Sequence, residues 1–466
     1  MKKLLLAMAL AMTTSLSAQQ KPWQHGPLKV SDNGRFLMHQ DGTPFFYLSE
    51  TAWLMPERLT RDEVTMYLQQ CRENGFNVVQ MQVMNGVPSY NVYGQPSVNA
   101  EWDFGLLEKG CNYSYWNHVD HIVNEAERMG IYVGMVCIWG SQVKSGNINE
   151  EQARSYGSFL ARRYGRKPNI VWIIGGDVQA DIHKEVWEAL ATTIRENDGR
   201  HLMTFHPRGR HTSAKWWAGA DWIDFHSYQS GHRRYGQRGS DKTYPIPDNT
   251  EEDCFQYVDS TWKSDPHRPV LDDEPVYEDI PQGLHSGDEP RWTAADVRRY
   301  AYWDVFAGCC GHAYGHNSIM QFYRPGQPSA YFAELPWYAA LNAPGFRQMK
   351  IVKQLMLSLP YFDRVPDQSV VTHNGQKYDR LAATRGEDYL LVYNYTGRLM
   401  EIDLTKISGE KKNLWWMDAQ TGRLRYLGTF GNKTVRLRPH DTFDGVLIAI
   451  DSEKQYITKQ QENILP

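Results

Sequence analysis

The sequence has little of several features that mark large protein classes. Only six cysteines occur among 466 residues, which argues against a disulfide-rich scaffold. Lys and Arg total 50 against 54 for Asp and Glu, a net charge of -4. Without an excess of positive charge to neutralise phosphates, the chain is not expected to bind nucleic acid. No stretch after the N-terminus approaches the length of apolar sequence that spans a bilayer, so we expect no membrane insertion.

The chain also lacks several motifs that would indicate other chemistries. It contains no G-x-G-x-x-G or Walker A motif, no H-E-x-x-H and no G-x-S-x-G. His312 and His316 have the spacing of metal ligands on a helix, but Gly311 and Gly315 argue against a helix there. The acidic run 272–278 remains an alternative calcium site. We expect no cofactor and no metal.

The first 18 residues have the pattern of an export signal. Lys2 and Lys3 precede the apolar run Leu4–Met12, and mostly small residues lead to Ala18. This run is too short to span a bilayer, and cleavage is expected after about Ala18. Residues 1–18 therefore predict an exported protein, periplasmic or secreted.

Aromatic residues are abundant, with 16 Trp and 27 Tyr. Flat rings fill protein cores, and they also form walls on which sugars stack. With 41% hydrophobic residues the chain can bury a large core, and its length predicts more than one domain.

Eight apolar runs of strand length alternate with helical patterns. Continuous apolar runs are typical of parallel strands that are buried on both faces. The predicted strands are Phe45–Leu48, Val78–Val83, Ile131–Ile138, Ile170–Ile174, Leu202–Phe205, Trp222–Phe225, Pro269–Leu271 and Gly308–Tyr314. Eight strand–helix units predict an α/β fold, a (β/α)8 TIM barrel. A doubly wound open sheet is the alternative.

The pattern changes to short β-rich runs near Tyr361. These runs are Leu390–Tyr395, Glu401–Leu404, Leu414–Met417, Thr434–Leu437 and Val446–Ile450, with glycines between them. Such spacing predicts a small C-terminal all-β sandwich domain. The predicted organisation is a signal peptide at 1–18, a hairpin segment at 19–43, a barrel at 44–360 and a β-sandwich at 361–466.

Two carboxylates end predicted barrel strands. Strand four ends in Gly175-Gly176-Asp177, and strand seven ends in Asp272-Asp273-Glu274. Barrel enzymes carry their reactive groups at the C-terminal ends of strands. Glycosidic bond cleavage needs two carboxyl groups, one to protonate the leaving oxygen and one to attack the anomeric carbon or activate water. Asp177 and Glu274 are therefore the predicted catalytic residues, although either type of residue also serves as a structural carboxylate.

Other predicted strand ends carry polar or aromatic residues suited to a sugar. Together they supply donors and acceptors for hydroxyl groups and an aromatic floor. The predicted substrate-binding residues are Glu50, Trp53, Gln82, Trp139, His206, Tyr228, Gln229, His232, Tyr277, Tyr314 and His316. Tyr228 is expected to hydrogen-bond Glu274. For each residue taken singly, core packing is an equally good explanation.

Four segments resemble the apiosidase-like glycosidases, glycoside hydrolase family 140. They are Ser49-Glu50-Thr51-Ala52-Trp53, Gly175-Gly176-Asp177, Tyr228-Gln229-Ser230-Gly231-His232 and Asp272-Asp273-Glu274-Pro275-Val276-Tyr277-Glu278. The likeness runs from about Pro44 to Phe362. The C-terminal segment, with Trp416-Met417-Asp418, is similar to the β-domain named collagen-binding that accompanies this barrel.

The resemblance implies a fold, a mechanism and a substrate. It implies a (β/α)8 barrel, a retaining mechanism, and action on apiose in pectin, notably in the side chains of rhamnogalacturonan II. By motif position, Asp177 is the acid/base and Glu274 the nucleophile. The alternative is a non-catalytic glycan- or matrix-binding protein whose β-domain is the binding module. The sequence makes no prediction of oligomeric state.

Overall fold

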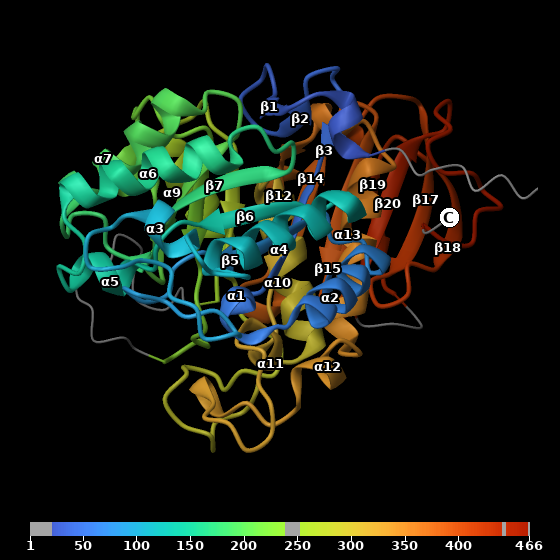
Figure 1. Ribbon diagram of the computed structural model, residues 1–466. Helices are drawn as coiled ribbons and strands as arrows, with labels where there is room; N and C mark the ends of the chain where they lie inside the picture. Colours follow the sequence, from blue (N-terminus) through green and yellow to red (C-terminus); the bar gives the residue numbers. More distant parts are fainter. Residues whose placement is uncertain (1–20, 238–251, 440–443, 465–466) are drawn as a thin grey trace, which may run out of the picture.

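The fold is described from a computed structural model, for residues 21–237, 252–439 and 444–464. Its centre is a curled sheet of parallel strands (Figure 1). These strands are β4 (Tyr47–Thr51), β5 (Val78–Gln82), β6 (Tyr132–Val136), β7 (Ile170–Val178), β8 (Met203–Pro207), β10 (His226–Gln229), β11 (Val270–Asp272) and β12 (Gly311–Tyr314). Six of them form one parallel sheet in the order β12-β4-β5-β6-β7-β8, and β10 pairs with β11 in parallel. The predicted export signal, residues 1–18, lies outside the described residues.

Backbone hydrogen bonds join the two groups of strands into a closed barrel. Beside β8, Asp224 N–H donates to the carbonyl oxygen of Met203 (2.9 Å). On the other side, Cys310 N–H donates to the carbonyl oxygen of Val270, which joins β11 to β12 (2.9 Å). The predicted (β/α)8 barrel followed by an all-β domain is therefore confirmed.

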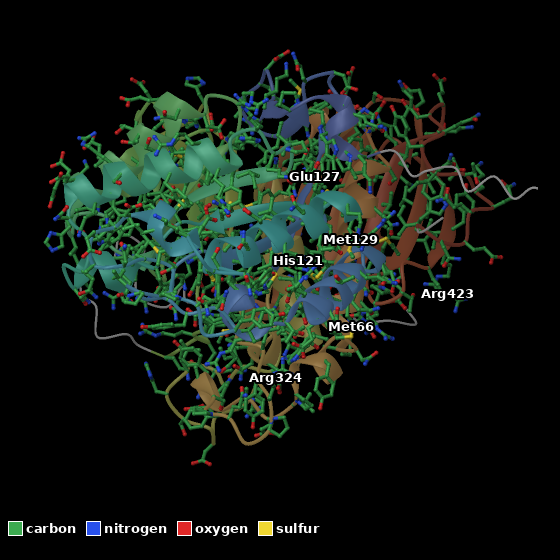
Figure 2. The ribbon with its side chains drawn as sticks, viewed as in Figure 1. Met66, His121, Glu127, Met129, Arg324 and Arg423 are labelled. Atoms are coloured by element: carbon green, nitrogen blue, oxygen red, sulfur yellow. The ribbon has the colours of Figure 1, made fainter. Side chains whose placement is uncertain are left out.

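Helices follow the strands and cover the barrel. The principal ones are α2 (Arg61–Glu73), α4 (Tyr115–Met129), α6 (Glu150–Tyr164), α7 (Lys184–Asn197), α9 (Phe255–Ser264), α10 (Ala294–Ala307) and α13 (Pro344–Leu357). Between β8 and β10 the chain forms only one helix, the short α8 (Ala214–Trp217). The outer helices are tied to barrel loops. For example, Arg324, labelled in Figure 2, lies in the segment after β12 and pairs with Glu63 of α2 (2.8 Å).

The sixth barrel strand was predicted too early in the chain. The apolar run 222–225 was expected to form it, but the strand comprises His226–Gln229. The strand tolerates polar residues because they find partners. His226 contacts Ser213 Oγ through Nδ1 (2.9 Å) and Asp265 Oδ2 through Nε2 (3.2 Å). Apolar character alone therefore misplaced this strand.

A small antiparallel sheet precedes the barrel. In it β1 (Leu28–Val30) pairs with β2 (Leu37–His39), and β2 pairs with β3 (Pro44–Phe45). Gly34 lies in the connecting turn with φ +70°, a conformation that glycine adopts without strain.

The C-terminal domain consists of antiparallel strands. A six-stranded sheet has the order β13-β14-β15-β20-β17-β18, and β16 pairs with β19 in a second sheet. The strands are β13 (Val365–Pro366), β14 (Leu381–Arg385), β15 (Tyr389–Asn394), β16 (Met400–Asp403), β17 (Lys411–Asp418), β18 (Leu424–Gly431), β19 (Thr434–Leu437) and β20 (Gly445–Asp451). Strands β14 and β18 were not among the predicted runs.

The β-domain packs against helix α10 of the barrel (Figure 1). Tyr302 of α10 stacks on Tyr393 of β15, with ring centroids 4.5 Å apart and planes inclined by 13°. Arg298, also on α10, forms a buried ion pair with Asp444. Aromatic stacking and a desolvated ion pair favour one orientation of the two domains. No helix in the described part of the chain is both long and apolar enough to cross a membrane.

Candidate active site

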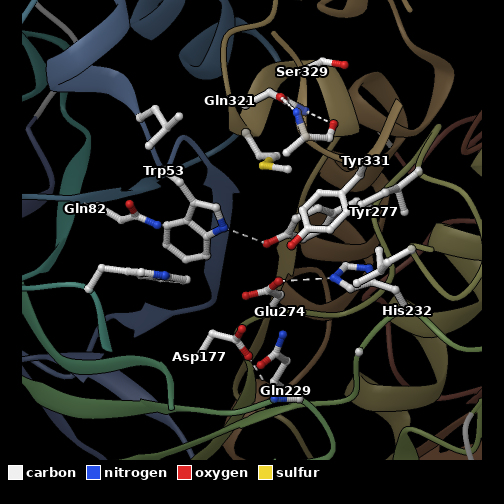
Figure 3. A pocket seen from close by; sticks show the side chains of 18 of the residues that line it. Trp53, Gln82, Asp177, Gln229, His232, Glu274, Tyr277, Gln321, Ser329 and Tyr331 are labelled. Atoms are coloured by element: carbon white, nitrogen blue, oxygen red, sulfur yellow. Dashed lines mark hydrogen bonds and ion pairs between the residues drawn. The ribbon is translucent and has the colours of Figure 1, made fainter. Parts of the chain in front are cut away.

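A cavity of about 840 Å³ opens at the C-terminal ends of the barrel strands (Figure 3). Asp177 and Glu274 both line it, although they are far apart in the sequence. Six of the predicted substrate-binding residues line it as well: Trp53, Gln82, Trp139, Gln229, His232 and Tyr277. Each comes from the end of a barrel strand or the loop after it, which is where this fold gathers functional side chains.

A backbone irregularity projects Asp177 into the cavity. Gly175, Gly176 and Asp177 have φ values of +86°, +135° and +48°, and the pairing of β7 with β8 shifts between Gly175 and Val178. A side chain at Gly176 would place its Cβ 2.7 Å from the Trp139 ring. Glycine is therefore required on both conformational and steric grounds. Asp177 is the one exposed residue of β7.

Two histidines hold Glu274. Nε2 of His206 lies 3.0 Å from Oε2, and Nε2 of His232 lies 3.2 Å from Oε1. His206 is a buried residue of β8, whereas His232 comes from the loop after β10. Each carboxylate oxygen therefore has its own imidazole partner, which fixes the orientation of the group.

His206 is itself placed between two acids. Its Nδ1 lies 2.8 Å from Oδ2 of Asp273, and its side chain is only 1% exposed. Burial alone lowers the pKa of His206, but the charges and hydrogen bonds of Asp273 and Glu274 outweigh burial and raise it to about 10. The ring is therefore an imidazolium at neutral pH, with a carboxylate oxygen within 3.0 Å of each nitrogen.

The two cavity carboxyl groups have pKa values shifted in opposite directions. The Asp177 carboxyl group faces the cavity, and the cavity walls shield it from bulk water. This desolvation and the nearby charge of Glu274 raise its pKa to about 6. Burial also favours a higher pKa for Glu274, but the hydrogen bonds from His206 and His232 outweigh it and lower the pKa to about 2. Between these values Asp177 holds a proton and Glu274 is ionised.

Aromatic side chains form a wall beside the carboxyl groups. Trp53 Nε1–H donates to the hydroxyl of Tyr277 (3.1 Å), and the ring centroids of Trp53 and Trp139 are 5.6 Å apart. The rings of Tyr277 and His232 meet edge to face at 4.7 Å. Such a surface suits the apolar face of a sugar ring, while Gln82 and Gln229 supply amide groups for hydroxyls.

Tyr228 lies elsewhere, and the prediction that it bonds Glu274 is wrong. Its hydroxyl donates to Asp304 of α10 (2.8 Å), and its ring stacks on Tyr257 of α9 at 5.3 Å. Side chains alternate along a strand, so Tyr228 faces the helices while its neighbour Gln229 faces the cavity. The same parity argument applies to the first and eighth barrel strands.

Glu50, Tyr314 and His316 also lie outside the cavity. Glu50 is 0% exposed, and neither carboxylate oxygen has a hydrogen-bond partner among the described residues. Burial raises its pKa well above the usual range, so it is neutral. The Tyr314 hydroxyl donates to Glu278 (2.6 Å). His316 accepts a hydrogen bond from Ser318 N–H at the start of a short helix (3.1 Å). Their predicted contact with substrate is not supported.

A group of cavity residues after β12 was not predicted from the sequence. Gln321, Ser329 and Tyr331 line the cavity, and Gln321 and Ser329 lie on the side away from Asp177 (Figure 3). The signals available were the position of this segment after the last barrel strand and its aromatic residues near Pro328. Neither signal predicts the course of the loop.

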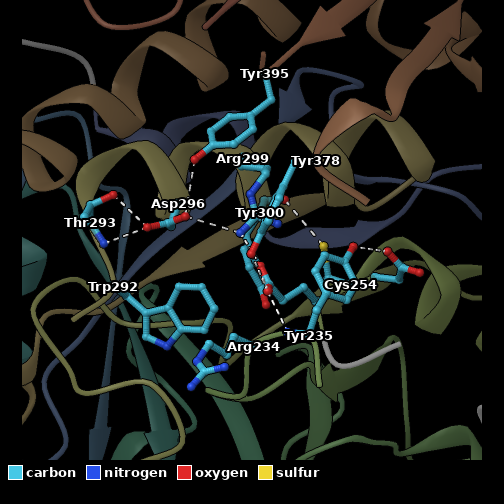
Figure 4. A network of polar contacts seen from close by, with 12 residues as sticks. Arg234, Tyr235, Cys254, Trp292, Thr293, Asp296, Arg299, Tyr300, Tyr378 and Tyr395 are labelled. Carbon is cyan, nitrogen blue, oxygen red and sulfur yellow. Dashed lines mark hydrogen bonds and ion pairs between the residues drawn. The ribbon is translucent and has the colours of Figure 1, made fainter. Parts of the chain in front are cut away.

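A buried polar network supports the loop that carries His232 (Figure 4). Arg299 of α10 forms an ion pair with Glu252 (2.6 Å), and both side chains are 0% exposed. The other oxygen of Glu252 accepts from Tyr235 N–H (2.7 Å) and from the hydroxyl of Tyr378 (2.8 Å). Tyr235 belongs to the His232 loop and Tyr378 to the β-domain. One carboxylate therefore joins the active-site loop, the barrel and the second domain.

Comparison with known proteins assigns the family. Residues 31–363 match the family model described as the apiosidase-like catalytic domain. The chain belongs to this apiosidase-like family. Residues 365–448 match a second model, described as "Putative collagen-binding domain of a collagenase". A search of curated proteins found no match.

Two solved structures are similar over almost the whole chain. One is a glycoside hydrolase family 5 protein from Bacteroides vulgatus, 55% identical with a TM-score of 0.94, covering 96% of this chain and 98% of that one. The other is described as a glycoside hydrolase, 55% identical with a TM-score of 0.92, covering 94% and 100%. Together with the family assignment, these similarities make this apiosidase-like protein a glycoside hydrolase with a carbohydrate substrate.

Proposed function

We propose that this protein is an exported retaining glycosidase that cleaves apiose linkages in rhamnogalacturonan II side chains of plant pectin. The observation that carries the proposal is the opposite shift of two carboxyl pKa values in one cavity, to about 6 for Asp177 and about 2 for Glu274. Glycosidases need one carboxyl group that holds its proton and one that has lost it. The choice of apiose rests on the apiosidase-like family.

In the first step Glu274 acts as nucleophile. One of its oxygens forms a bond to the anomeric carbon while the bond from that carbon to the leaving oxygen breaks. Asp177 transfers its proton to the leaving oxygen, so the departing glycan leaves as a neutral alcohol. His206 and His232 orient the attacking carboxylate through their hydrogen bonds.

In the second step the covalent glycosyl ester is hydrolysed. Asp177, now a carboxylate, takes a proton from water as the water oxygen attacks the anomeric carbon. The ester bond breaks and returns Glu274 to its ionised form. Two displacements at the same carbon retain its configuration.

The test is a digest of a panel of pectic glycans, with products identified. Wild-type protein is expected to release apiose, with the anomeric configuration retained when the fresh product is followed by NMR. Asp177→Asn and Glu274→Gln should lower kcat at least 10³-fold by removal of acid and nucleophile while the far-UV spectrum stays unchanged. Wild-type activity in Glu274→Gln would refute the assignment, and an inverted product would refute the retaining mechanism.

Two further outcomes concern the alternative function and the location. If no panel glycan is cleaved but a fragment of residues 361–466 retains a pectic glycan, the non-catalytic binding function is supported instead. The export part of the proposal rests on residues 1–18. N-terminal sequencing of the protein from the periplasm or medium should begin near Gln19, and a cytoplasmic protein that begins at Met1 would contradict export.

A further inference from the structure

The segment after β12 places the side chain of Tyr331 in the active-site cavity (Figure 3). Its position is set by side chains that bond to the backbone beside it. Gln321 Oε1 accepts from Ala330 N–H (2.7 Å), and Gln321 Nε2–H donates to the Ala330 carbonyl oxygen (2.9 Å). Asn317 Nδ2–H donates to the carbonyl oxygen of Tyr331 itself (2.8 Å). Three hydrogen bonds therefore hold three consecutive peptide groups, and the last two of these flank the Cα of Tyr331.

The backbone at this point is strained. Tyr331 and Phe332 have φ values of +50° and +56°, a region that residues with bulky side chains rarely occupy. Arg291 stabilises the second residue by donating to the Phe332 carbonyl oxygen (2.7 Å) and pairs with Glu334 (2.7 Å). Strained conformations persist where the surroundings enforce them, and they cluster at functional sites. In this backbone conformation the Tyr331 ring lines the cavity.

The Tyr331 hydroxyl is available for a ligand. Among the described residues it has no hydrogen-bond partner, and Tyr331 is 41% exposed and lines the cavity. Burial, together with the charges of Glu274 and Asp177, raises the pKa of the phenol, so it keeps its proton and acts as a donor. Both oxygens of Glu274 already have imidazole partners. A phenol that donates to no protein group and lines the cavity can donate to an oxygen of a bound sugar.

We propose that Tyr331 is a substrate-contacting residue of this glycosidase: its hydroxyl donates a hydrogen bond to an oxygen of the sugar held between Asp177 and Glu274. This inference rests on the proposed glycosidase function. Because the loop backbone is held on both sides of Tyr331, the Cα that carries the donor has a fixed position. The site then selects sugars that present an acceptor oxygen at that point.

The test compares Tyr331→Phe with wild type on the pectic glycan that the wild type cleaves. The ring and its packing remain, so thermal stability should not change, while loss of one donor should lower kcat/KM about 10- to 100-fold. A larger loss in kcat than in KM indicates a bond that strengthens in the transition state. Tyr338→Phe is the matched control, because Tyr338 is an exposed tyrosine on the nearby α12 (Trp337–Ala340) outside the cavity. It should stay within twofold of wild type.

Tyr331→Phe within twofold of wild type overturns the proposal for this residue, whereas wild-type activity in Glu274→Gln overturns the glycosidase mechanism instead. If the wild type cleaves no panel glycan, calorimetric binding of free apiose decides. Tighter binding to wild type than to Tyr331→Phe, by about tenfold, supports the contact. Equal binding, or none to either protein, overturns it.

Discussion

His206 lies between two acids, with Nε2 hydrogen-bonded to Oε2 of Glu274 (3.0 Å) and Nδ1 within ion-pair distance, 2.8 Å, of Oδ2 of Asp273. This chain of groups explains how a buried carboxylate stays ionised. The positive ring lies between the carboxylates of Asp273 and Glu274. The ionised state of Glu274, the proposed nucleophile, therefore depends on His206, whose side chain is only 1% exposed.

Replacing His206 by glutamine should raise the pKa of Glu274. Glutamine offers a neutral donor, so the charge that favours the ionised carboxylate is lost, while burial still disfavours it. We expect the acid limb of the kcat/KM profile to move to higher pH and the maximum to fall about 10- to 100-fold. Profiles of His206→Gln and wild type between pH 3 and pH 9 measure both effects. His285→Gln is the control, since His285 lines the cavity and, among the described residues, bonds neither carboxyl group. An unmoved acid limb in His206→Gln would contradict the proposed role.

Activity should decline as the pH rises above about 6. Asp177 must hold a proton to act as the acid, and its pKa is raised to about 6, so the competent fraction falls tenfold per pH unit well above that value. Glu274 stays ionised down to about pH 2 and sets the acid limb. A kcat/KM profile on the natural glycan tests this. In Asp177→Asn the alkaline limb should disappear, and the residual rate should be greatest for an activated aryl glycoside, which needs no acid.

Gly176→Ala should displace the acid. The added Cβ would lie 2.7 Å from the Trp139 ring at a φ of +135°, so the bulge must move and carry Asp177 with it. We expect at least a 100-fold loss of kcat and a loss of about 1–3 kcal/mol in the free energy of unfolding. Gly146→Ala is a control for backbone conformation alone, because Gly146 has φ +72° and no atom near its Cβ position. Equal activity in the two variants would show that steric contact with Trp139 is unimportant.

Arg299→Met should destabilise the protein strongly. It leaves the buried Glu252 carboxylate without its ion-pair partner, which costs about 3–5 kcal/mol. Chemical denaturation followed by tryptophan fluorescence measures the change. Arg154→Met removes an exposed Arg–Glu pair with Glu150 and should cost less than about 1 kcal/mol. Similar losses in the two variants would contradict the buried-pair argument.

The sequence was sufficient to predict the barrel and to place both carboxyl groups at strand ends. It failed where side-chain parity or a distant contact decides the outcome. Tyr228 and Glu50 lie on strands that reach the cavity, but on the faces that meet the helices. A strand shifted by one residue exchanges these faces, and apolar runs define strand ends too loosely to choose.

Tyr331 could not be predicted for a different reason. Its ring reaches the cavity through an unfavourable local conformation that bonds from Gln321, Asn317 and Arg291 enforce. Local sequence preferences oppose that conformation, so only the assembled structure reveals it. Strand β18 was missed similarly, because Arg425 and Gly428 interrupt its apolar pattern while pairing with β17 supplies its stability.

The shared acceptor at Glu252 has a practical consequence for anyone who wishes to engineer this enzyme. In a barrel expressed without the C-terminal β-domain, the Glu252 carboxylate would lose the hydrogen bond from Tyr378. The same carboxylate oxygen accepts from the backbone N–H of Tyr235, close to His232. Truncation, or exchange of the β-domain for another module, would thus weaken the support of the loop whose His232 hydrogen-bonds Glu274, the proposed nucleophile. Fusion tags and linkers belong at the chain ends, and the junction near residue 364 should be left intact.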